Sequence, residues 1–580
     1  MSFKLFISST IITIVSQVHF NVFSQSRNFD SKKLGTFKPK NYSIAPKLPK
    51  PPKPEAFEVT TIPIPNEVSE VSLVNYLPDN EHLIMDVTMK GKHESDLAVM
   101  KEDGSEFKCL TCHLNQPIGD EMPVPLPDGK RVYTPRGILE CSPSIVDCKE
   151  AKILPLVFPE IPGARFLARI ATNMSQDGIH VAYTLITTRP TSLVLVSELT
   201  RVSDQKGERY ELTKTRVIAG DKTLETDSSY FRPYFYGNGE VKSFTDMGRY
   251  LSTITTFEAN NYDICKIDLK TGDVSRFTRH FSYDEGVYPS PDGKWIIFQT
   301  QRHHNRMDAF GLIPRPLIAG TSLSAGVAEY RNQWIAPHRE GKDGNGRHRR
   351  FYGLTMTDQF GDRNRLPEKG YTGQNLTVAK DNLIEYNHFG NFAWHKSSTK
   401  GIFWEQKDHW QLKEGEQLGR LRLIKFTSRK PTNPLPVYTP TLDWALKLED
   451  LKPMVNTKIP TEGILKGKVS GYANISLDTS NPKEPMFKIE YFNFTDDGEY
   501  VLNGNEKRNA PNPNDPFSRT SHWFADLKVS GKHKGFLKVD NVWFYPDKIG
   551  SGTINAQLDN RKVDVDLAKG LPTGVPGELR

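Results

Sequence analysis

Side chains that can transfer protons or hold an anion are concentrated in one part of this 580-residue chain. Eight of its 15 histidines lie between His280 and His409, and residues 302–369 hold ten arginines and two lysines against seven acidic residues. Imidazole can act as a base near neutral pH, and arginine can grip a carboxylate or sulfate through two bonds. The segment therefore predicts either a site for an anionic sugar or a basic, solvent-exposed insertion.

The candidate site residues flank apparent strands in this region. The catalytic candidates are two histidines and two tyrosines: His303, His388, Tyr288 and Tyr386. The candidates for substrate binding are Arg302, Arg331, Trp334 and His338. A divalent metal held by His303, His304 and His388 is a further hypothesis, although their spacing is not diagnostic of a ligand set. No other cofactor is expected.

A short repeated phrase shows which elements must position these residues. It combines Asp or Pro-Asp with a glycine or asparagine and precedes an apolar strand, and its aspartates are Asp79, Asp128, Asp177, Asp246 and Asp292. Their spacings are 49, 49, 69 and 46 residues. Proline presets φ and glycine accepts positive φ, so each phrase predicts a turn. The spacing is that of β-propeller blades, with one insertion. A last copy of the phrase, at residues 496–498, favours some involvement of the C-terminal region in the propeller.

A second phrase, strand–turn–strand, occurs at residues 96–111, 263–278 and 352–366. Helical periodicity is scarce along the whole chain. We therefore predict an all-β fold, a six- or seven-bladed β-propeller followed by a C-terminal antiparallel β meander. Ile296 and Phe298, on the strand after the clearest turn, should be buried.

The predicted organisation has four parts. Residues 1–25 have one lysine before an apolar stretch, and they are too short and serine-rich to span a bilayer, so they predict a cleaved signal peptide. Residues 26–57 are a Pro/Lys-rich linker, residues 58–455 the propeller, and residues 456–580 a β-rich region that completes the propeller or packs on it. We expect an exported protein, periplasmic or secreted, with no transmembrane segment.

Composition limits the partners. A net charge of +7 is too mild to indicate a nucleic-acid binder, and 25% charged residues exclude a membrane-embedded chain. We expect a monomer. Export favours disulfides among the five cysteines, and the pairs 109–112 and 141–148 would leave Cys265 as a buried thiol.

The turn at residues 290–294, Ser-Pro-Asp-Gly-Lys, matches the repeat of TolB-type propellers, and the resemblance covers roughly residues 60–450. A narrower pattern resembles secreted fungal saponin hydrolases and their bacterial relatives. It consists of residues 103–112, which include Cys109-Leu-Thr-Cys112, together with residues 491–498 and 503–506. This second resemblance implies a substrate with terminal glucuronic acid, and bacterial relatives in ulvan breakdown include dehydratases.

Three functions follow, in order of preference. The first is β-elimination from a glucuronyl sugar, with His303 or His388 as base, Tyr288 or Tyr386 as acid and Arg331 holding the carboxylate. The second is glucuronide hydrolysis, which needs two carboxyl groups at a fixed separation. Its candidates are Glu258, Asp284, Glu285, Glu329 and Glu405. The third is a non-catalytic propeller that binds a glycan or a protein.

Overall fold

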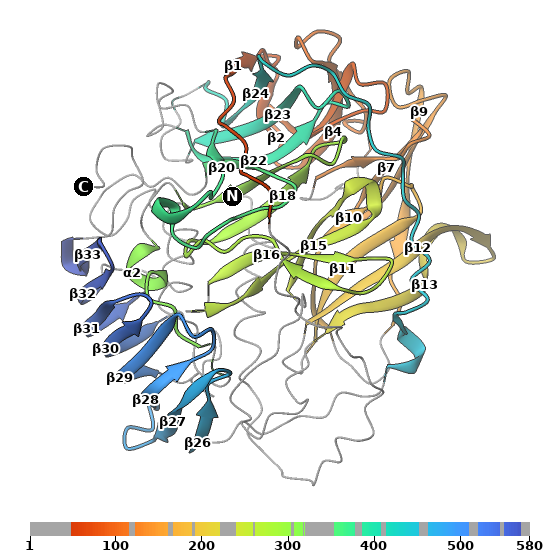
Figure 1. The fold of residues 1–580 in the computed structure, drawn as a ribbon. Helices are drawn as coiled ribbons and strands as arrows, with labels where there is room; N and C mark the ends of the chain where they lie inside the picture. Colours follow the sequence, from red (N-terminus) through yellow and green to blue (C-terminus); the bar gives the residue numbers. More distant parts are fainter. Residues whose placement is uncertain are drawn as a thin grey trace.

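The described part of the chain consists almost entirely of antiparallel sheets (Figure 1). The structure is a computed structural model and describes residues 48–114, 122–160, 166–187, 192–220, 239–258, 261–302, 307–316, 318, 353–376, 386–407, 413, 415–451, 462–509, 520–545 and 550–569. Among these residues, no helix is both long and apolar enough to cross a bilayer.

Six four-stranded units form the propeller, within the described residues. Blade 1 contains β2 (Val68–Tyr76), β3 (His82–Met89), β4 (Ser95–Lys101) and β5 (Lys108–Cys109). Blade 2 contains β6 (Val124–Pro125), β7 (Arg131–Thr134), β8 (Gly137–Ser142) and β9 (Glu150–Val157). Blade 3 contains β10 (Phe166–Met174), β11 (His180–Thr187), β12 (Ser192–Asp204) and β13 (Gly207–Gly220).

The other three blades have the same up-and-down order. Blade 4 contains β14 (Glu240–Thr245), β15 (Tyr250–Thr256), β16 (Tyr262–Asp268) and β17 (Val274–Arg276). Blade 5 contains β18 (Asp284–Pro289), β19 (Trp295–Thr300), β20 (Gly353–Asp358) and β21 (Gln374–Asn375). Blade 6 contains β22 (Tyr386–Trp394), β23 (Lys400–Lys407) and β24 (Gly419–Phe426), and its fourth strand is the N-terminal β1 (Phe57–Ile62).

The two ends of the propeller segment meet in blade 6. β1 pairs with β24 in antiparallel register from Phe57–Phe426 to Ile62–Leu421. Blades 2 and 3 are joined at their outer edges, where β9 and β13 pair in parallel, and β25 (Leu446–Lys447) adds to β13. These pairings confirm the predicted all-β propeller, and the described residues form six blades, one of the two predicted numbers.

The repeated turn is held by its aspartate. Asp177 Oδ1 accepts the backbone N–H groups of Ile179 and His180 at 2.9 and 3.0 Å. Asp128 binds residues 130 and 131 in the same way, and Gly129, Gly178 and Gly293 have φ between 66° and 70°. The aspartate therefore fixes where each second strand begins. Ile296 and Phe298, which follow one such turn, are buried as predicted.

The first strand of each blade forms an inner ring, and side-chain amides cross between neighbouring blades there. Asn391 of β22 donates to the carbonyl of Val74 of β2 at 2.6 Å. Asn173 of β10 donates to the carbonyl of Lys242 of β14 at 3.2 Å. The two acceptors, Val74 and Lys242, lie at bulges of β2 and β14, where the regular strand pairing is interrupted, and these contacts satisfy them.

The C-terminal region forms its own eight-stranded meander beside the propeller (Figure 1). Its strands are β26 (Glu462–Lys466), β27 (Ser470–Asp478), β28 (Met486–Thr495), β29 (Tyr500–Asn509), β30 (Ser521–Gly531), β31 (Gly535–Phe544), β32 (Ser551–Leu558) and β33 (Arg561–Asp566). The last copy of the repeated phrase, at residues 496–498, connects β28 to β29 and so belongs to no blade.

One face of this meander packs on the segment that follows β19. The shared core includes Phe310 of the short helix α2 (Asp308–Gly311) and Trp523 of β30. Arg561 of β33 binds Asp308 at 2.6 Å, and buried Arg315 lies 3.3 Å from Glu506 of β29. The C-terminal sheet therefore covers the chain that leaves blade 5. The exact domain boundaries remain a prediction.

We predict that the closing strand carries a large share of the stability. Ile62→Ala should lower the free energy of unfolding by about 2–5 kcal/mol, because the buried Ile62 side chain packs between blades 6 and 1. Ile464→Ala, at a position that is 53% exposed, should change it by less than about 0.5 kcal/mol. Urea unfolding measures both. Equal effects would contradict closure by β1.

Candidate active site at the junction of blades 6 and 1

The inner strands of all six blades run in the same direction, because every blade repeats the same order of strands. Their first residues therefore lie at one face of the propeller. The chain also leaves β19 toward residues 302–352 at this face, since β19 is antiparallel to the inner strand β18. Tyr386 and the end of β19 therefore lie at the face where the inner strands begin, whereas Tyr288, near the end of β18, lies toward the opposite face.

Glu70 is a half-buried carboxyl group near the start of β2. Burial raises the pKa of Glu70 to about 7. Across the ranges that the structure describes, its side chain forms no ion pair or hydrogen bond, so no cation holds it ionised. A carboxyl group of this kind exchanges protons readily near neutral pH, which is what a general acid or base requires.

The segment before and into β24 lies directly against Glu70. Gln417 Nε2 donates to the carbonyl of Val68, and the backbone N–H of Leu418 donates to the carbonyl of Ser69, both at 3.0 Å. A Cβ at Gly419 would lie 2.4 Å from the Val71 carbonyl oxygen, so only glycine allows this approach. Leu421, two residues farther along β24, packs in the core shared with β2, and Arg420 lies on the opposite face of the strand.

Two cations and a phenol occupy the blade 6 side of this junction. The Arg420 guanidinium lies 3.6 Å from the ring centroid of Tyr386, the first residue of β22, and Lys407 Nζ lies 5.1 Å from it. Arg420 binds Glu405 at 2.5 Å, and Lys407 binds Glu416 at 3.2 Å. This face of the propeller thus holds a titratable carboxyl group on blade 1 and, on blade 6, a phenol and two cations that are each paired with a carboxylate. Glu70 is opposite Thr88 in the register, whereas Val71 and Val87 form the core that is shared with blade 6.

Only one of the predicted catalytic residues has a side chain at this junction in the described structure, namely Tyr386. His388 follows on β22, but its side chain lies outside the described part, as do His303, His304, Arg331, Trp334 and His338. Tyr288 of β18 is half-buried, and burial together with Glu285 raises the pKa of its phenol. Its ring packs near Phe392, so its environment resembles a core more than an open site.

Arg302 is held between two carboxylates. Its Nε lies 3.0 Å from Asp284, one terminal nitrogen lies 2.7 Å from Asp362, and the side chain is 2% exposed. Asp284 and Asp362 hold the pKa of Arg302 above its ordinary value. These contacts give Arg302 a structural role and leave it few donors for a substrate, although its predicted binding role has not been tested.

The other described cations of residues 302–369 are also engaged. Arg315 faces Glu506, Arg363 binds Asp358, Arg365 donates to the carbonyl of Leu312, and Lys369 binds Asp559. Contacts inside the protein therefore neutralise part of the excess positive charge of residues 302–369. The remaining arginines of this segment lie outside the described residues.

The carboxylates considered for hydrolysis are ion-paired wherever the structure describes them. Glu258 binds Arg276, Asp284 binds Arg302, Glu285 binds Lys242 at 2.7 Å and Glu405 binds Arg420. Lys242 also binds Glu240 at 2.8 Å and so joins the inner strands of blades 4 and 5. Glu329 lies outside the described residues. Glu70, which sequence reasoning missed, differs from these four in having no such partner.

The repeat gives no signal that singles out Glu70. The inner strands begin between 4 and 11 residues before the turn aspartate, and Glu70 is the third residue of its strand. Nothing in the sequence shows that Glu70 shares a propeller face with Arg420 and Lys407, because they are about 340 residues away in the chain.

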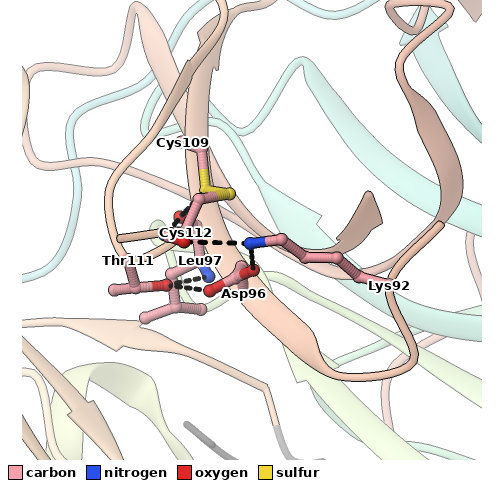
Figure 2. The surroundings of a disulfide bond; sticks show 6 residues. All are labelled: Lys92, Asp96, Leu97, Cys109, Thr111 and Cys112. Carbon is pink, nitrogen blue, oxygen red and sulfur yellow. Dashed lines mark hydrogen bonds and ion pairs between the residues drawn. A yellow bond between two sulfur atoms is a disulfide. The ribbon is translucent and has the colours of Figure 1, made fainter. Parts of the chain in front are cut away.

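A cluster with metal-ligand chemistry lies in blade 1, at Asp96, Cys109 and Cys112 (Figure 2). The two sulfur atoms form a disulfide, so neither is a thiolate that could bind a metal. Asp96 accepts a hydrogen bond from Thr111 at 2.9 Å and faces Lys92. A second disulfide joins Cys141 and Cys148, and Cys265 is a buried free thiol, as predicted. A metal bound by His303, His304 and His388 remains a prediction.

Comparisons with known proteins give a fold likeness and no family. No family model and no curated protein matches the chain. Among solved structures, the chain is similar to TolB from Acinetobacter baumannii, with 13% identity, a TM-score of 0.29 and coverage of 61% of this chain and 63% of that one. It is also similar to an oligogalacturonate lyase in complex with manganese, with 10% identity, a TM-score of 0.34 and coverage of 66% and 99%.

A third similar structure is prolyl oligopeptidase B from Galerina marginata, with 12% identity, a TM-score of 0.28 and coverage of 74% of this chain and 48% of that one. The chain thus spans less than two thirds of the TolB and of the peptidase. Identities and TM-scores this low carry no argument about function, and the propeller assignment rests on the strand pairing.

We predict that Arg302→Gln destabilises the protein strongly, because it leaves Asp284 and Asp362 buried without their cation. The expected loss is about 3–5 kcal/mol in the free energy of unfolding. Arg201→Gln removes a guanidinium that is 42% exposed from Glu140, and should cost at most about 1 kcal/mol. Thermal unfolding of both variants checks this. If Arg302→Gln is as stable as the wild type, Arg302 does not have this structural role.

Proposed function

We propose that this protein is an exported enzyme that acts on glucuronic-acid-containing oligosaccharides by β-elimination. The observation that carries the proposal is the Glu70 carboxyl group, whose pKa is about 7, at the propeller face where Arg420, Lys407 and Tyr386 of blade 6 also lie. Elimination next to a carboxylate needs a base, a cation for the carboxylate and an acid for the leaving oxygen. The junction offers all three kinds of group.

In the proposed reaction, Glu70 in its ionised form takes the proton from C5 of the glucuronyl residue. The electrons of the C5–H bond form a double bond between C4 and C5, and the C4–O bond breaks. The departing oxygen takes a proton from Tyr386 and leaves as water or as an alcohol. Arg420 and Lys407 stabilise the charge that develops on the substrate carboxylate. His388, farther along β22, remains the alternative base.

Export is supported by the two disulfides, since such bonds persist in oxidising compartments. The signal peptide predicted at residues 1–25 lies outside the described residues. We propose that the enzyme acts as a monomer in the periplasm or outside the cell.

Hydrolysis is the second candidate, and one observation favours it. Glu405, near the end of β23, lies at the same propeller face as Glu70 and is paired with Arg420 and Arg422. A protonated Glu70 and an ion-paired Glu405 would be the acid and the carboxylate that a glycosidase needs. The two reactions give different products, because elimination yields an unsaturated uronate and hydrolysis yields free glucuronic acid.

We predict that Glu70→Gln lowers turnover of a glucuronyl oligosaccharide by about 10²–10⁴-fold, because the amide cannot accept the C5 proton. Glu67→Gln, an exposed glutamate on the preceding turn, is the matched control and should retain activity. Ultraviolet absorbance of the unsaturated product follows elimination, and chromatography detects free glucuronic acid. Equal activity of both variants would place the base elsewhere. Binding without either product would favour a non-catalytic propeller.

We also predict a pH dependence of stability that comes from Glu70 alone. The unfolded carboxyl ionises near 4.5, while the folded carboxyl stays protonated up to about 7. Stability should therefore fall as pH rises from about 4.5 to about 7, because folding must bury a charge that the unfolded chain exposes to water. The free energy of unfolding of Glu70→Gln, relative to that of the wild type, should therefore be higher at pH 8 than at pH 4. An identical difference at both pH values would contradict the raised pKa.

A further inference from the structure

The face of the C-terminal sheet that points away from the shared core carries an ordered row of side chains. Register places Lys466, Tyr472 and Phe492 opposite one another on β26, β27 and β28. On β29, β30 and β31, Asn503, Lys528 and Phe536 are opposite one another. Asn503 joins the two halves, because its side chain bonds Asn493, the neighbour of Phe492, at 2.9 and 3.1 Å. We call these six residues the aromatic–lysine row.

The aromatic members of the row form a flat and accessible platform. Tyr472 and Phe492 have ring centroids 5.0 Å apart and an interplanar angle of 22°. Both side chains are 40% exposed, and Phe536 is 37% exposed. Most other large apolar side chains described in this sheet lie on the opposite face, in the core shared with α2. Exposed aromatic rings on an otherwise polar face are costly in water unless a ligand covers them.

The charge of the row has one sign. It contains Lys466 and Lys528 and no acidic residue, whereas the adjoining row on the same face contains Glu490 and Asp526. Lys528 forms no ion pair or hydrogen bond within the ranges that the structure describes. An anionic chain that lies along the aromatic–lysine row would therefore contact cations and amides. In the adjoining row, the carboxylates of Glu490 and Asp526 would repel it.

The dimensions of the row suit an extended polymer. Its aromatic members extend from Tyr472 on β27 to Phe536 on β31, four strand spacings of about 4.8 Å, so the platform is about 19 Å long. The apolar faces of sugar rings stack on exposed aromatic side chains, and the amide and lysine groups between them can bind hydroxyl and carboxylate oxygens.

We propose that the aromatic–lysine row is a binding site for an acidic polysaccharide chain, separate from the junction of blades 6 and 1. The choice of a uronate polymer as ligand rests on the proposed function, and the site would hold a long substrate close to the enzyme. The opposite face of the sheet is fixed to the segment after β19, so the row is presented on a rigid support.

The test is isothermal titration of the full-length protein with polyglucuronate, and with hydroxyethyl cellulose as a neutral polymer. The wild type should bind polyglucuronate, more weakly at high salt, and should not bind the neutral polymer. The double variant Tyr472→Ala/Phe492→Ala should lose about tenfold or more in affinity. Lys528→Gln should reduce both the affinity and its salt dependence. Lys538→Gln, in the acidic row of the same face, is the matched control and should bind like the wild type.

Three outcomes would overturn the proposal: unchanged affinity in the Tyr472/Phe492 double variant, equal binding of the neutral polymer, or a change of sedimentation that shows the row to be a contact between two copies. Turnover of a glucuronyl disaccharide, which is too short to reach the row, separates this proposal from the proposed function. Row variants should leave that turnover unchanged. If the wild type lacks turnover but binds the polymer through the row, the proposed function fails and the binding site stands.

Discussion

The pairing of β1 with β24 is the interaction on which the candidate site depends. It joins residues 57–62 to residues 421–426, and so closes the ring between the first and last blades. β2 follows β1 after a short turn, and the chain reaches Glu70 eight residues after Ile62. The same pairing places residues 417–420 against residues 68–71. Without this closure, the core that Val71 shares with Leu421 and Leu423 of blade 6 would be open to water.

Around this closure, buried ion pairs hold residues together within a blade and between neighbouring blades. Arg302 is fixed by Asp284 and Asp362, and Lys242 joins Glu240 to Glu285 across two blades. Buried ions of this kind add little net stability but penalise any arrangement in which a partner is missing, so they favour one packing of the blades. Among the inner-strand carboxylates discussed above, Glu70 differs in having no cationic partner. A carboxyl group shielded from water without a cation is more typical of functional sites than of structural ones.

The sequence was sufficient for the blades, because each aspartate turn is a local structure whose hydrogen bonds lie within four residues, as at Asp177. The disulfides and the burial of Ile296 followed from equally local patterns. The candidate site could not be found this way. Tyr386 was identified by its type, but Glu70 and Arg420 come to the same face of the propeller only through closure of the ring. The basic composition of residues 302–369 was misleading in part, since Arg302, Arg315 and Arg363 all meet carboxylates inside the protein. Residues 496–498 resemble the turn phrase of the blades in sequence and were therefore linked to the propeller, but they join two strands of the C-terminal sheet.

The central claim is that Glu70 removes the C5 proton of a glucuronyl residue. It is tested most directly by comparing turnover of a glucuronyl oligosaccharide with hydrogen and with deuterium at C5. The account predicts slower turnover of the deuterated substrate, formation of an unsaturated product, and loss of that product in Glu70→Gln. Equal rates for the two substrates together with release of free glucuronic acid would contradict it, because hydrolysis leaves the C5–H bond intact.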